Sequence, residues 1–251
     1  MTRRFHGKVV VITGVNAGLG RALAHDFTSE GASIVGCDLA EISTTDAVAF
    51  YQRCDVTSAA DVEALIANTR ARFGRIDVLV NNAGAVSRGS AASLAEADWD
   101  RIMDTNAKGT FLACRGVIPV MSEQPHGGAI VNIASQAAQR PERYLSHYCA
   151  AKAAVAHYSR ALALELAPAI RVNCVNPGFV ETDMSVASLE GYARETGIPY
   201  ETARQARRDV IPMGRFQQPH DIAEAVMFLA SESASEITGD ALEVSGGQVL
   251  G

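Results

Sequence analysis

The stretch TGVNAGLG at residues 13–20 follows a short apolar run and precedes an amphipathic stretch at 19–30. Gly14 allows a tight turn, Gly18 lets the backbone approach a ligand, and Gly20 lets a helix pack closely against a strand. The free N–H groups at the start of that helix attract phosphate groups. The stretch therefore predicts a strand–turn–helix unit that binds a pyrophosphate, through Gly14, Asn16, Ala17, Gly18, Leu19 and Gly20. The alternative is a turn that holds no ligand.

An acidic residue, Asp38, lies about twenty positions beyond this turn, at the end of the next apolar run. A carboxylate there can accept hydrogen bonds from both ribose hydroxyls of an adenosine, and it repels a 2′-phosphate. No arginine or lysine follows Asp38 closely, and none lies at 15–17. Together these features predict a site for NAD rather than NADP. The alternative is that Asp38 only caps the segment that follows it.

Seven short apolar runs alternate with longer amphipathic stretches. Several runs are nearly continuous in Val and Ile, as is typical of strands buried on both faces of a parallel sheet. We predict strands at 8–13, 33–37, 50–54, 77–81, 129–134, 170–176 and 241–245, and helices at 19–30, 58–73, 148–167 and 221–230. This order predicts an α/β fold, with a Rossmann-type, doubly wound parallel sheet of about seven strands in three layers, as one domain over 1–251.

Two segments depart from the alternation of strands and helices. The crossover at 38–49 is short, so we expect a loop or a single helical turn there. The stretch at 183–218 is polar and helical in propensity, and it lies between the sixth strand and the next helix. Long excursions of this kind are usually functional. We therefore expect 183–218 to bind substrate, for example as a lid.

The composition limits the classes of partner and location. Of the 251 residues, 48% are apolar, which is typical of a globular protein, and the net charge of −6 includes no block of like charges. We therefore expect neither nucleic acids nor anionic membranes as partners, because both need a clustered basic surface. The apolar run after the basic start is too short for a signal peptide or a membrane span. We expect a cytoplasmic protein.

The cysteines also favour a reducing compartment. They are scattered and odd in number, form no C-x-x-C pair, and lie at positions 37, 54, 114, 149 and 174. We expect small buried thiols in place of disulfides. No cysteine–histidine cluster has the spacing of a zinc site, so we predict no metal.

Tyr148 and Lys152 lie four residues apart in a predicted helix and therefore share one face of it. A nearby ammonium group stabilises a phenolate and lowers the pKa of a tyrosine, so this one could exchange a proton with a substrate oxygen. Ser135 ends the fifth predicted strand, at the edge where parallel sheets bind ligands. Asn106 lies in a probable helix, where an asparagine is mildly unfavourable and invites explanation. These four residues form a candidate catalytic site.

The chain resembles the short-chain dehydrogenase/reductase family from about residue 7 to 251. Several independent motifs occur in the family's order, which makes the resemblance specific. They are TGVNAGLG at 13–20, CDVT at 54–57, NNAG at 81–84, Asn106, the serine of NIAS at 132–135, YCAAK at 148–152 and NPGFVET at 176–182.

The resemblance implies a role for each matching residue. It makes Tyr148 the general acid/base, and it makes Lys152 the group that lowers the tyrosine pKa and binds the nicotinamide ribose. It makes Ser135 the residue that orients substrate, and Asn106 the residue that holds a water in a proton relay. It also implies nucleotide contacts: Asp55 and Val56 at the adenine, Asn82, Ala83 and Gly84 beside the adenosine ribose, and Pro177, Gly178, Val180 and Thr182 at the nicotinamide carboxamide.

The sequence favours an enzyme that interconverts a secondary alcohol and its ketone with NAD. A polyol, a sugar or a cyclic alcohol is the expected substrate class. We expect the residues after Ser135 to line the substrate pocket, with Gln136 in contact with substrate; Arg140 and Arg143 follow in the same loop. One alternative is a 3-oxoacyl-thioester reductase that uses NADPH. Another, from a different class, is a non-catalytic nucleotide-binding regulator on the same fold.

Two further expectations concern neighbouring helix positions. His147 and Cys149 flank Tyr148, and adjacent helix positions point in other directions, so we interpret both as packing residues. The helix at 148–167 is apolar over much of its circumference, which indicates subunit contacts as well as core packing. Since members of the resembled family are typically tetramers, we predict a homotetramer with dihedral symmetry.

Overall fold

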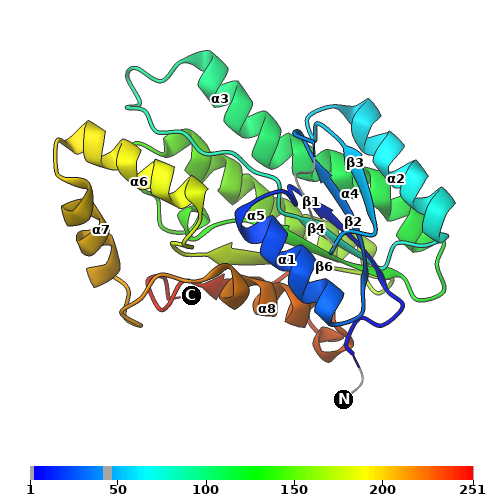
Figure 1. Ribbon diagram of the computed structural model, residues 1–251. Helices are drawn as coiled ribbons and strands as arrows, with labels where there is room; N and C mark the ends of the chain where they lie inside the picture. The colour runs from blue at the N-terminus through cyan, green and yellow to red at the C-terminus, as the bar shows by residue number, and fades with distance from the viewer. Residues whose placement is uncertain (1–2, 42–46, 251) are drawn as a thin grey trace.

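A parallel seven-stranded sheet organises the chain, in the order β3-β2-β1-β4-β5-β6-β7 (Figure 1). The computed structural model describes residues 3–41 and 47–250. The strands are β1 (Val9–Thr13), β2 (Ser33–Asp38), β3 (Phe50–Arg53), β4 (Val78–Asn81), β5 (Gly128–Ile133), β6 (Ile170–Pro177) and β7 (Ala241–Val244). β1 pairs with β2 on one side and β4 on the other, so the order reverses there. In doubly wound sheets, ligands bind at this switch point.

Helices cover both faces of the sheet, which confirms the predicted three-layer fold (Figure 1). They are α1 (Gly18–Ser29), α2 (Ala59–Phe73), α3 (Glu96–Met103), α4 (Gly109–Ser122), α5 (Ser146–Leu166), α6 (Asp183–Thr196), α7 (Tyr200–Asp209) and α8 (Pro219–Ala230). Val9 and Val11 of β1 pack with α2, α4 and α5, whereas Val10 and Ile12 pack with α1 and α8. Successive strand residues face opposite sides, so each strand supplies two cores.

The predicted strands are all present, with ends that differ by one residue or so. Ser58 caps α2 by accepting a hydrogen bond from the Asp61 N–H, and Gly74 ends that helix in a left-handed conformation, both as expected from sequence. α5 begins at Ser146, two residues before the predicted start. In the crossover after β2, residues 39–41 and 47–49 contain no helix, and 42–46 lie outside the described residues.

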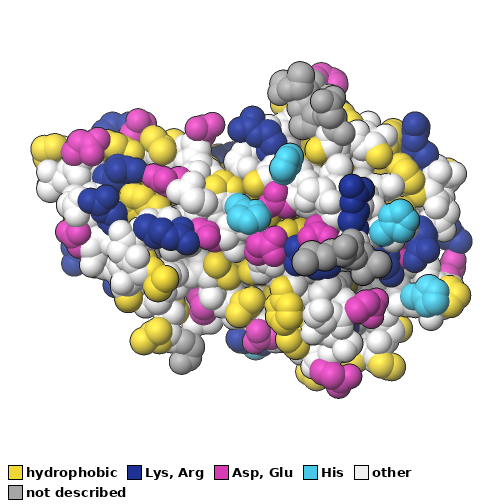
Figure 2. All heavy atoms as spheres, turned by 60° about the horizontal axis from the view of Figure 1, so that its bottom comes forward, with side chains coloured by type: hydrophobic (Ala, Val, Ile, Leu, Met, Phe, Trp, Pro, Cys, Tyr) yellow, Lys and Arg dark blue, Asp and Glu magenta, His cyan; other side chains and the backbone are white. Residues whose placement is uncertain are grey.

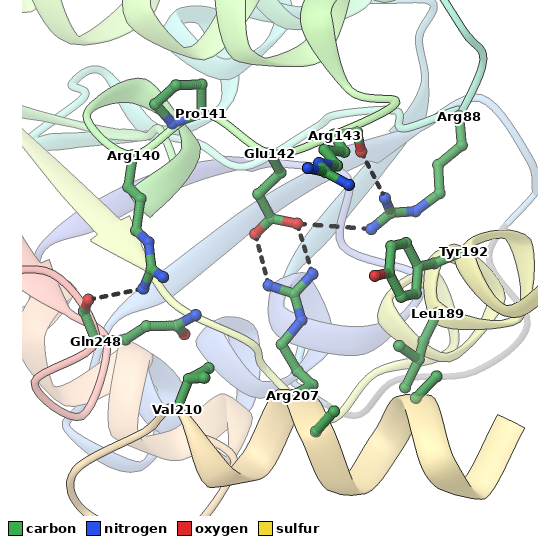
Figure 3. Close-up of a pocket in the computed structure, with 12 residues that line it drawn as sticks. Arg88, Arg140, Pro141, Glu142, Arg143, Leu189, Tyr192, Arg207, Val210 and Gln248 are labelled. Carbon is green, nitrogen blue, oxygen red and sulfur yellow. Dashed lines mark hydrogen bonds and ion pairs between the residues drawn. The ribbon is translucent and has the colours of Figure 1, made fainter. Parts of the chain in front are cut away.

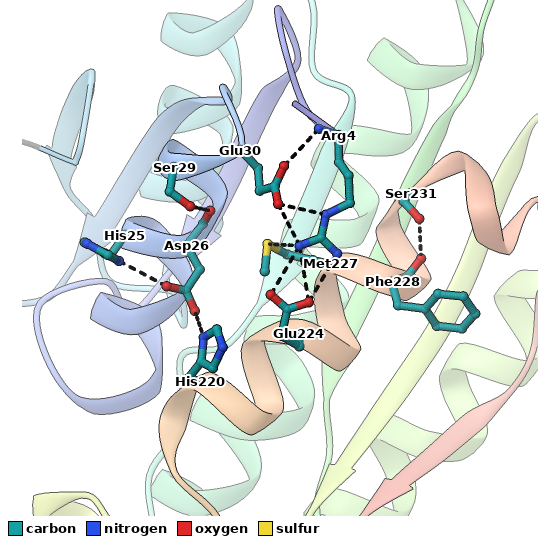
Figure 4. A network of polar contacts seen from close by, with 10 residues as sticks. All are labelled: Arg4, His25, Asp26, Ser29, Glu30, His220, Glu224, Met227, Phe228 and Ser231. Atoms are coloured by element: carbon teal, nitrogen blue, oxygen red, sulfur yellow. Dashed lines mark hydrogen bonds and ion pairs between the residues drawn. The ribbon is translucent and has the colours of Figure 1, made fainter. Parts of the chain in front are cut away.

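Polar contacts join α1, α8 and the segment before β1 (Figure 4). The Arg4 guanidinium donates to Glu30 at the end of α1 and to Glu224 of α8, at 3.0 to 3.2 Å. His220, in the first turn of α8, contacts Asp26 of α1 at 2.8 Å. These exposed pairs each contribute little to stability. Their common effect is to fix two helices that pack on the same face of the sheet.

The excursion at 183–218 forms α6 and α7, which lie side by side at one end of the molecule (Figure 1). Leu189 and Ala193 of α6 pack against Ala203 of α7 in a small buried cluster of their own. Figure 2 shows basic and acidic side chains interspersed over the face that carries α7 and α8, with basic groups gathered toward the end at which α7 lies. None of the helices described is long and apolar enough to cross a membrane.

Candidate functional site

A cleft of about 670 Å³ opens at the carboxyl ends of the central strands. All the residues predicted to bind cofactor or to act in catalysis line it, except Asn16, and Gln136, which was predicted to bind substrate, does not line it either. The predicted residues that line it are Gly14, Ala17, Gly18, Leu19, Gly20, Asp38, Asp55, Val56, Asn82, Ala83, Gly84, Asn106, Ser135, Tyr148, Lys152, Pro177, Gly178, Val180 and Thr182. The fold thus brings together residues that are up to 168 positions apart in the chain, from Gly14 to Thr182.

The turn between β1 and α1 forms one wall of the cleft and depends on glycine. Gly14 has a φ of +72°, which favours glycine strongly. A side-chain carbon at Gly20 would lie only 1.8 Å from the Gly14 carbonyl oxygen, so no larger residue fits. No side chain among the described residues caps the start of α1, where Ala17 is the capping position. The first N–H groups of the helix are therefore available to an anion.

Asn82 and Thr13 hold this turn against the neighbouring strand. The Asn82 side-chain amide donates to the carbonyl oxygens of Thr13 at 3.0 Å and Gly14 at 2.9 Å. In return, the Thr13 hydroxyl accepts from the N–H groups of Asn82 and Ala83, at 3.1 and 3.0 Å. The position of Thr13 was not singled out from sequence. In the described structure, the Thr13 hydroxyl is the only side-chain group that accepts hydrogen bonds from these two adjacent N–H groups, so it fixes this part of the cleft wall.

Asp38 ends β2, and its carboxylate lies beside the glycine-rich turn. It accepts hydrogen bonds from the backbone N–H groups of Asn16 at 3.1 Å and Leu39 at 2.8 Å. The Asn16 side chain points away from the cleft, donating to the carbonyls of Ala40 and Glu41. Asn16 therefore shapes the turn with its side chain and orients Asp38 with its backbone. Asn16 does not line the main cleft, because its amide donates to the segment after β2, and its contact with a cofactor stays a prediction.

A cation that was not predicted from the sequence lies near Asp38. Arg53 of β3 is in register with Asp38 across the sheet, and its guanidinium donates to the Leu39 carbonyl at 2.9 Å. Arg53 is not a close neighbour of Asp38 in the sequence, and it comes near Asp38 because β3 pairs with β2. Arg53 is exposed and does not line the cleft.

Tyr148 and Ser135 meet at the other end of the cleft. The Ser135 hydroxyl accepts from the Ala137 N–H at 3.1 Å, at the start of a short 3-10 turn. Burial raises the pKa of Tyr148 to about 12, and a hydrogen bond with Ser135 opposes that rise. The direction is opposite to the one expected from the Tyr–Lys spacing. The physical reason is that the loss of water around the phenol outweighs the hydrogen bond.

Lys152 is buried on the same face of α5. Its Nζ lies 5.8 Å from the centre of the Tyr148 ring and donates to the Ile133 carbonyl at 2.9 Å. Burial lowers the pKa of Lys152 to about 8. The ammonium group is therefore close to the tyrosine but poorly solvated, which weakens its preference for the charged state.

Asn106 lies in one π-helical turn, Asp104–Lys108, between α3 and α4. Its amide nitrogen donates to the carbonyls of Ala85 and Ile102, both at 2.9 Å, while its buried Oδ1 has no partner among the described residues. A side-chain carbon at Gly84 would lie 2.8 Å from this oxygen and 3.5 Å from Lys152 Nζ. The unpaired Asn106 oxygen and the Lys152 amine thus lie on either side of Gly84. The π-helical turn that carries Asn106 is a feature common at functional sites.

The residues predicted to form the substrate wall line two cavities that are each smaller than the main cleft: Gln136 lines one, and Arg140 and Arg143 line the other. Gln136 lines a cavity of about 80 Å³ that also contacts Ser135 and Tyr148, rather than the main cleft. His147 and Cys149 are buried in packing positions, as expected; His147 bonds to Ser87 at 2.9 Å. Met184, Ser188 and Arg207 of this cavity come from the 183–218 excursion that was expected to bind substrate, whereas Phe179 was not among the expected wall residues.

The cysteines are all buried and free. Among the described residues, no group of three or more His, Cys, Asp or Glu side chains is placed to hold a metal ion.

Comparison with known proteins decides the family. A family model described as enoyl-(acyl carrier protein) reductase matches residues 14–248. The chain is 39% identical to 2-(S)-hydroxypropyl-CoM dehydrogenase 3 of Xanthobacter autotrophicus, over 98% of each protein. The chain belongs to the short-chain dehydrogenase/reductase family. It is also 34% identical to the 3-oxoacyl-acyl-carrier-protein reductase of Thermotoga maritima, over 98% of this chain and 100% of that one.

A solved structure of the family has the same architecture. The ligand-free aldohexose dehydrogenase of Thermoplasma acidophilum is 34% identical and aligns with a TM-score of 0.91, covering 99% of this chain and 96% of that chain. The chain is therefore an oxidoreductase of a family that uses nicotinamide cofactors.

The residues of the cleft fit a nicotinamide dinucleotide. The uncapped start of α1 suits a pyrophosphate, and a side chain at Gly14 would collide with Ala83 at 2.9 Å and fill the turn. At the opposite end, Gly178 is hemmed in by Gln217 and Ser245 and belongs to the segment after β6. Dinucleotide binding would therefore extend from Asp38, past the turn, to Lys152 and Thr182.

Proposed function

We propose that this short-chain dehydrogenase/reductase uses NAD to interconvert a secondary alcohol and its ketone, with Tyr148 as general acid/base. The observation that carries the proposal is that Ser135, Tyr148 and Lys152 line the same cleft as Asp38 and the glycine-rich turn. A dinucleotide bound from the turn to the lysine would end beside the tyrosine. The site thus combines a nucleotide cradle with a group that can exchange a proton.

Tyr148 and Ser135 act on the same substrate oxygen. In oxidation, the phenol oxygen accepts the hydroxyl proton of the alcohol; in reduction, it returns a proton to the carbonyl oxygen. The Ser135 hydroxyl donates a hydrogen bond to that oxygen and holds it beside the tyrosine. The bound nicotinamide supplies the hydride acceptor for oxidation and the hydride donor for reduction.

Lys152 and Asn106 supply a route for the proton. The unpaired Oδ1 of Asn106 and the Nζ of Lys152 flank Gly84, where an ordered water can accept from Lys152 Nζ and donate to Asn106 Oδ1. Because burial holds the pKa of Lys152 near 8, the amine can release a proton close to neutral pH. The buried pair therefore connects the tyrosine to solvent without a carboxylate.

A polyol, a sugar or a cyclic alcohol is the substrate class that we propose. Two similar proteins have names that point to such substrates: one is an aldohexose dehydrogenase, which names a sugar, and the other is a 2-(S)-hydroxypropyl-CoM dehydrogenase, which names a secondary alcohol. A test is to assay a panel of secondary alcohols and ketones with NAD and NADP. No turnover on any member would contradict the proposal and favour a nucleotide-binding regulator.

A 3-oxoacyl-thioester reductase is the second candidate, because Arg53 places a cation beside the adenosine end. The similarity to a 3-oxoacyl-acyl-carrier-protein reductase points the same way. Asp38 opposes this alternative when the cofactor carries a 2′-phosphate, since its carboxylate lies inside the cleft whereas Arg53 lies outside it.

Asp38 sets the cofactor preference, and Asp38→Asn tests this. Asparagine removes the charge and keeps one carbonyl acceptor, so only one of the Asn16 and Leu39 N–H groups retains its side-chain partner. We expect the ratio of kcat/KM for NAD to that for NADP to fall by about tenfold or more, since hydrogen bonds to charged groups contribute roughly 1.5–3 kcal/mol. Initial rates with both cofactors measure the ratio. Glu63→Gln removes a carboxylate on the distant helix α2 and should leave it unchanged.

The assembly that we propose is a homotetramer, and light scattering at micromolar concentration tests it. Phe111 of α4 is 41% exposed and Leu164 of α5 is 86% exposed, so apolar groups cover part of the outer surface of these neighbouring helices. The Phe111 ring lies 6.3 Å from that of Tyr158 of α5. Such a face favours subunit contact. A mass of about 106 kDa, four times the chain mass of 26.5 kDa, is expected, and a monomeric mass would contradict the proposal.

A further inference from the structure

A second cavity, of about 240 Å³, lies between the loop after β5 and helices α6 and α7. Its charged lining consists of one carboxylate and four guanidinium groups, so it carries an excess of three positive charges. These residues are Arg88, Arg140, Glu142, Arg143 and Arg207. Figure 3 shows the guanidinium groups of Arg88 and Arg207 directed at the Glu142 carboxylate, with Arg140 and Arg143 at its sides.

Glu142 is fully engaged by its neighbours. Arg207 donates to both of its carboxylate oxygens, at 2.8 and 2.5 Å, and Arg88 lies 3.6 Å away. Although burial alone would raise it, the contact with Arg207 holds the pKa of Glu142 below its ordinary value. The Arg88 and Arg207 side chains are only 6% and 16% exposed. The single negative charge of Glu142 therefore compensates only one of these two positive charges.

The remaining cations lack a carboxylate of their own. Arg88 otherwise donates to backbone carbonyls, those of Ser188 at 2.7 Å and Arg143 at 3.1 Å. Arg140 donates to the Gln248 carbonyl at 3.2 Å. Across the described residues, no acidic group lies within ion-pair distance of Arg140 or Arg143. Arg140 and Arg143 are themselves exposed, so they attract an anion through solvent, and Arg88 adds a buried positive charge to the same cavity.

The cationic cavity adjoins the catalytic tyrosine. The small cavity that contains Ser135, Gln136 and Tyr148 is also lined by Arg88, Glu142 and Arg207. The same three charged residues line the larger cationic cavity. These three residues form a wall common to both cavities, so an anion in the larger cavity lies next to the cavity that contains Tyr148.

We propose that this cavity is an anion subsite and that the substrate carries a multi-oxygen anion, a carboxylate or a sulfonate, a few atoms from its reacting carbon. The inference rests on the proposed interconversion of a secondary alcohol and its ketone, and it adds an anionic group to that substrate, whatever its carbon skeleton. Arg140 and Arg143 bind the anion, and the Glu142–Arg207 pair positions Arg88 beside it. Planar guanidinium groups suit such anions because they donate two parallel hydrogen bonds.

The test uses methyl ketones whose carboxylate lies one to four methylene groups from the carbonyl, with the matching primary amides and sulfonates. Reduction is assayed with NADH, and binding to the NAD-saturated protein is measured separately by calorimetry. For the best chain length we expect kcat/KM for the anion to exceed that for the amide by about tenfold or more, and the preference to weaken as salt rises. Comparison of carboxylate with sulfonate identifies the preferred anion.

The variant R140Q/R143Q should raise KM for the anionic ketone about tenfold, with kcat and the amide kinetics little changed. R208Q is the matched control, since Arg208 lies beside Arg207 on α7 but does not line the cavity. Equal kinetics for anion and amide, or no arginine-dependent binding of any anion, would overturn the subsite while leaving the dehydrogenase intact. Binding of the anion that depends on these arginines, without turnover of any ketone, would support the subsite and overturn the proposed function.

Discussion

Tyr148→Phe should lower kcat by about a thousandfold while nucleotide affinity stays the same. The change removes only the phenol oxygen, which is the sole group that we assign to proton exchange with substrate, and such groups contribute roughly 10²–10⁴ in rate. The ring still packs beside Lys152 and the cleft keeps its shape. Steady-state rates on a productive alcohol measure the loss, and calorimetry measures NAD binding. Normal turnover in this variant would refute the role of Tyr148.

Tyr158→Phe is the matched control, because it makes the same change ten residues further along α5, where the ring packs against Phe111. The pH dependence gives a second check on Tyr148. Oxidation needs the deprotonated phenol, and burial raises the pKa of Tyr148 to about 12, so its rate should rise between pH 6 and 8. Reduction needs the protonated phenol, which dominates over the same range, so its rate should not rise. The variant should lose this contrast.

Local patterns predicted much of this fold and of the nucleotide cradle. The seven strands, the glycine-rich turn and Asp38 at the end of β2 were all predictable, because each depends on residues close together in the chain. The continuous burial of the central strands was also predictable, since nearly unbroken runs of Val and Ile are typical of strands covered by helices on both faces. Tyr148, Lys152 and Ser135 came from motif and spacing, and the structure brings them to one cleft.

Contacts between distant segments could not be predicted in this way. Glu142 and Arg207 are 65 residues apart and meet only because α7 folds back over the loop before α5. Arg53 reaches the edge of the adenosine region by strand pairing rather than by following Asp38. The direction of the Tyr148 pKa was also wrong from sequence, because spacing reveals the nearby lysine but not the loss of water around both groups.

Lys152→Met should abolish most turnover and also change how stability depends on pH. Burial lowers the pKa of Lys152 from 10.5 to about 8, so between these values the unfolded chain binds more protons than the folded one. Stability then rises with pH across this interval, and the cost of burying the ammonium is present in full below pH 8. Methionine has a similar length and no charge, so the variant lacks this dependence.

The measurement is the free energy of unfolding in urea for both proteins at several pH values from 7 to 10. Relative to the variant, the wild type should gain about 2 kcal/mol over this range, since one pKa unit corresponds to about 1.4 kcal/mol. The variant also loses the hydrogen bond to the Ile133 carbonyl, but that loss is the same at every pH and shifts only the offset between the two curves. In the folded state, the Tyr148 phenol loses its proton mainly above pH 10, and it is present in both proteins. Parallel curves would mean that Lys152 is solvated in the folded protein, and the proton route through Asn106 would then lose its buried amine.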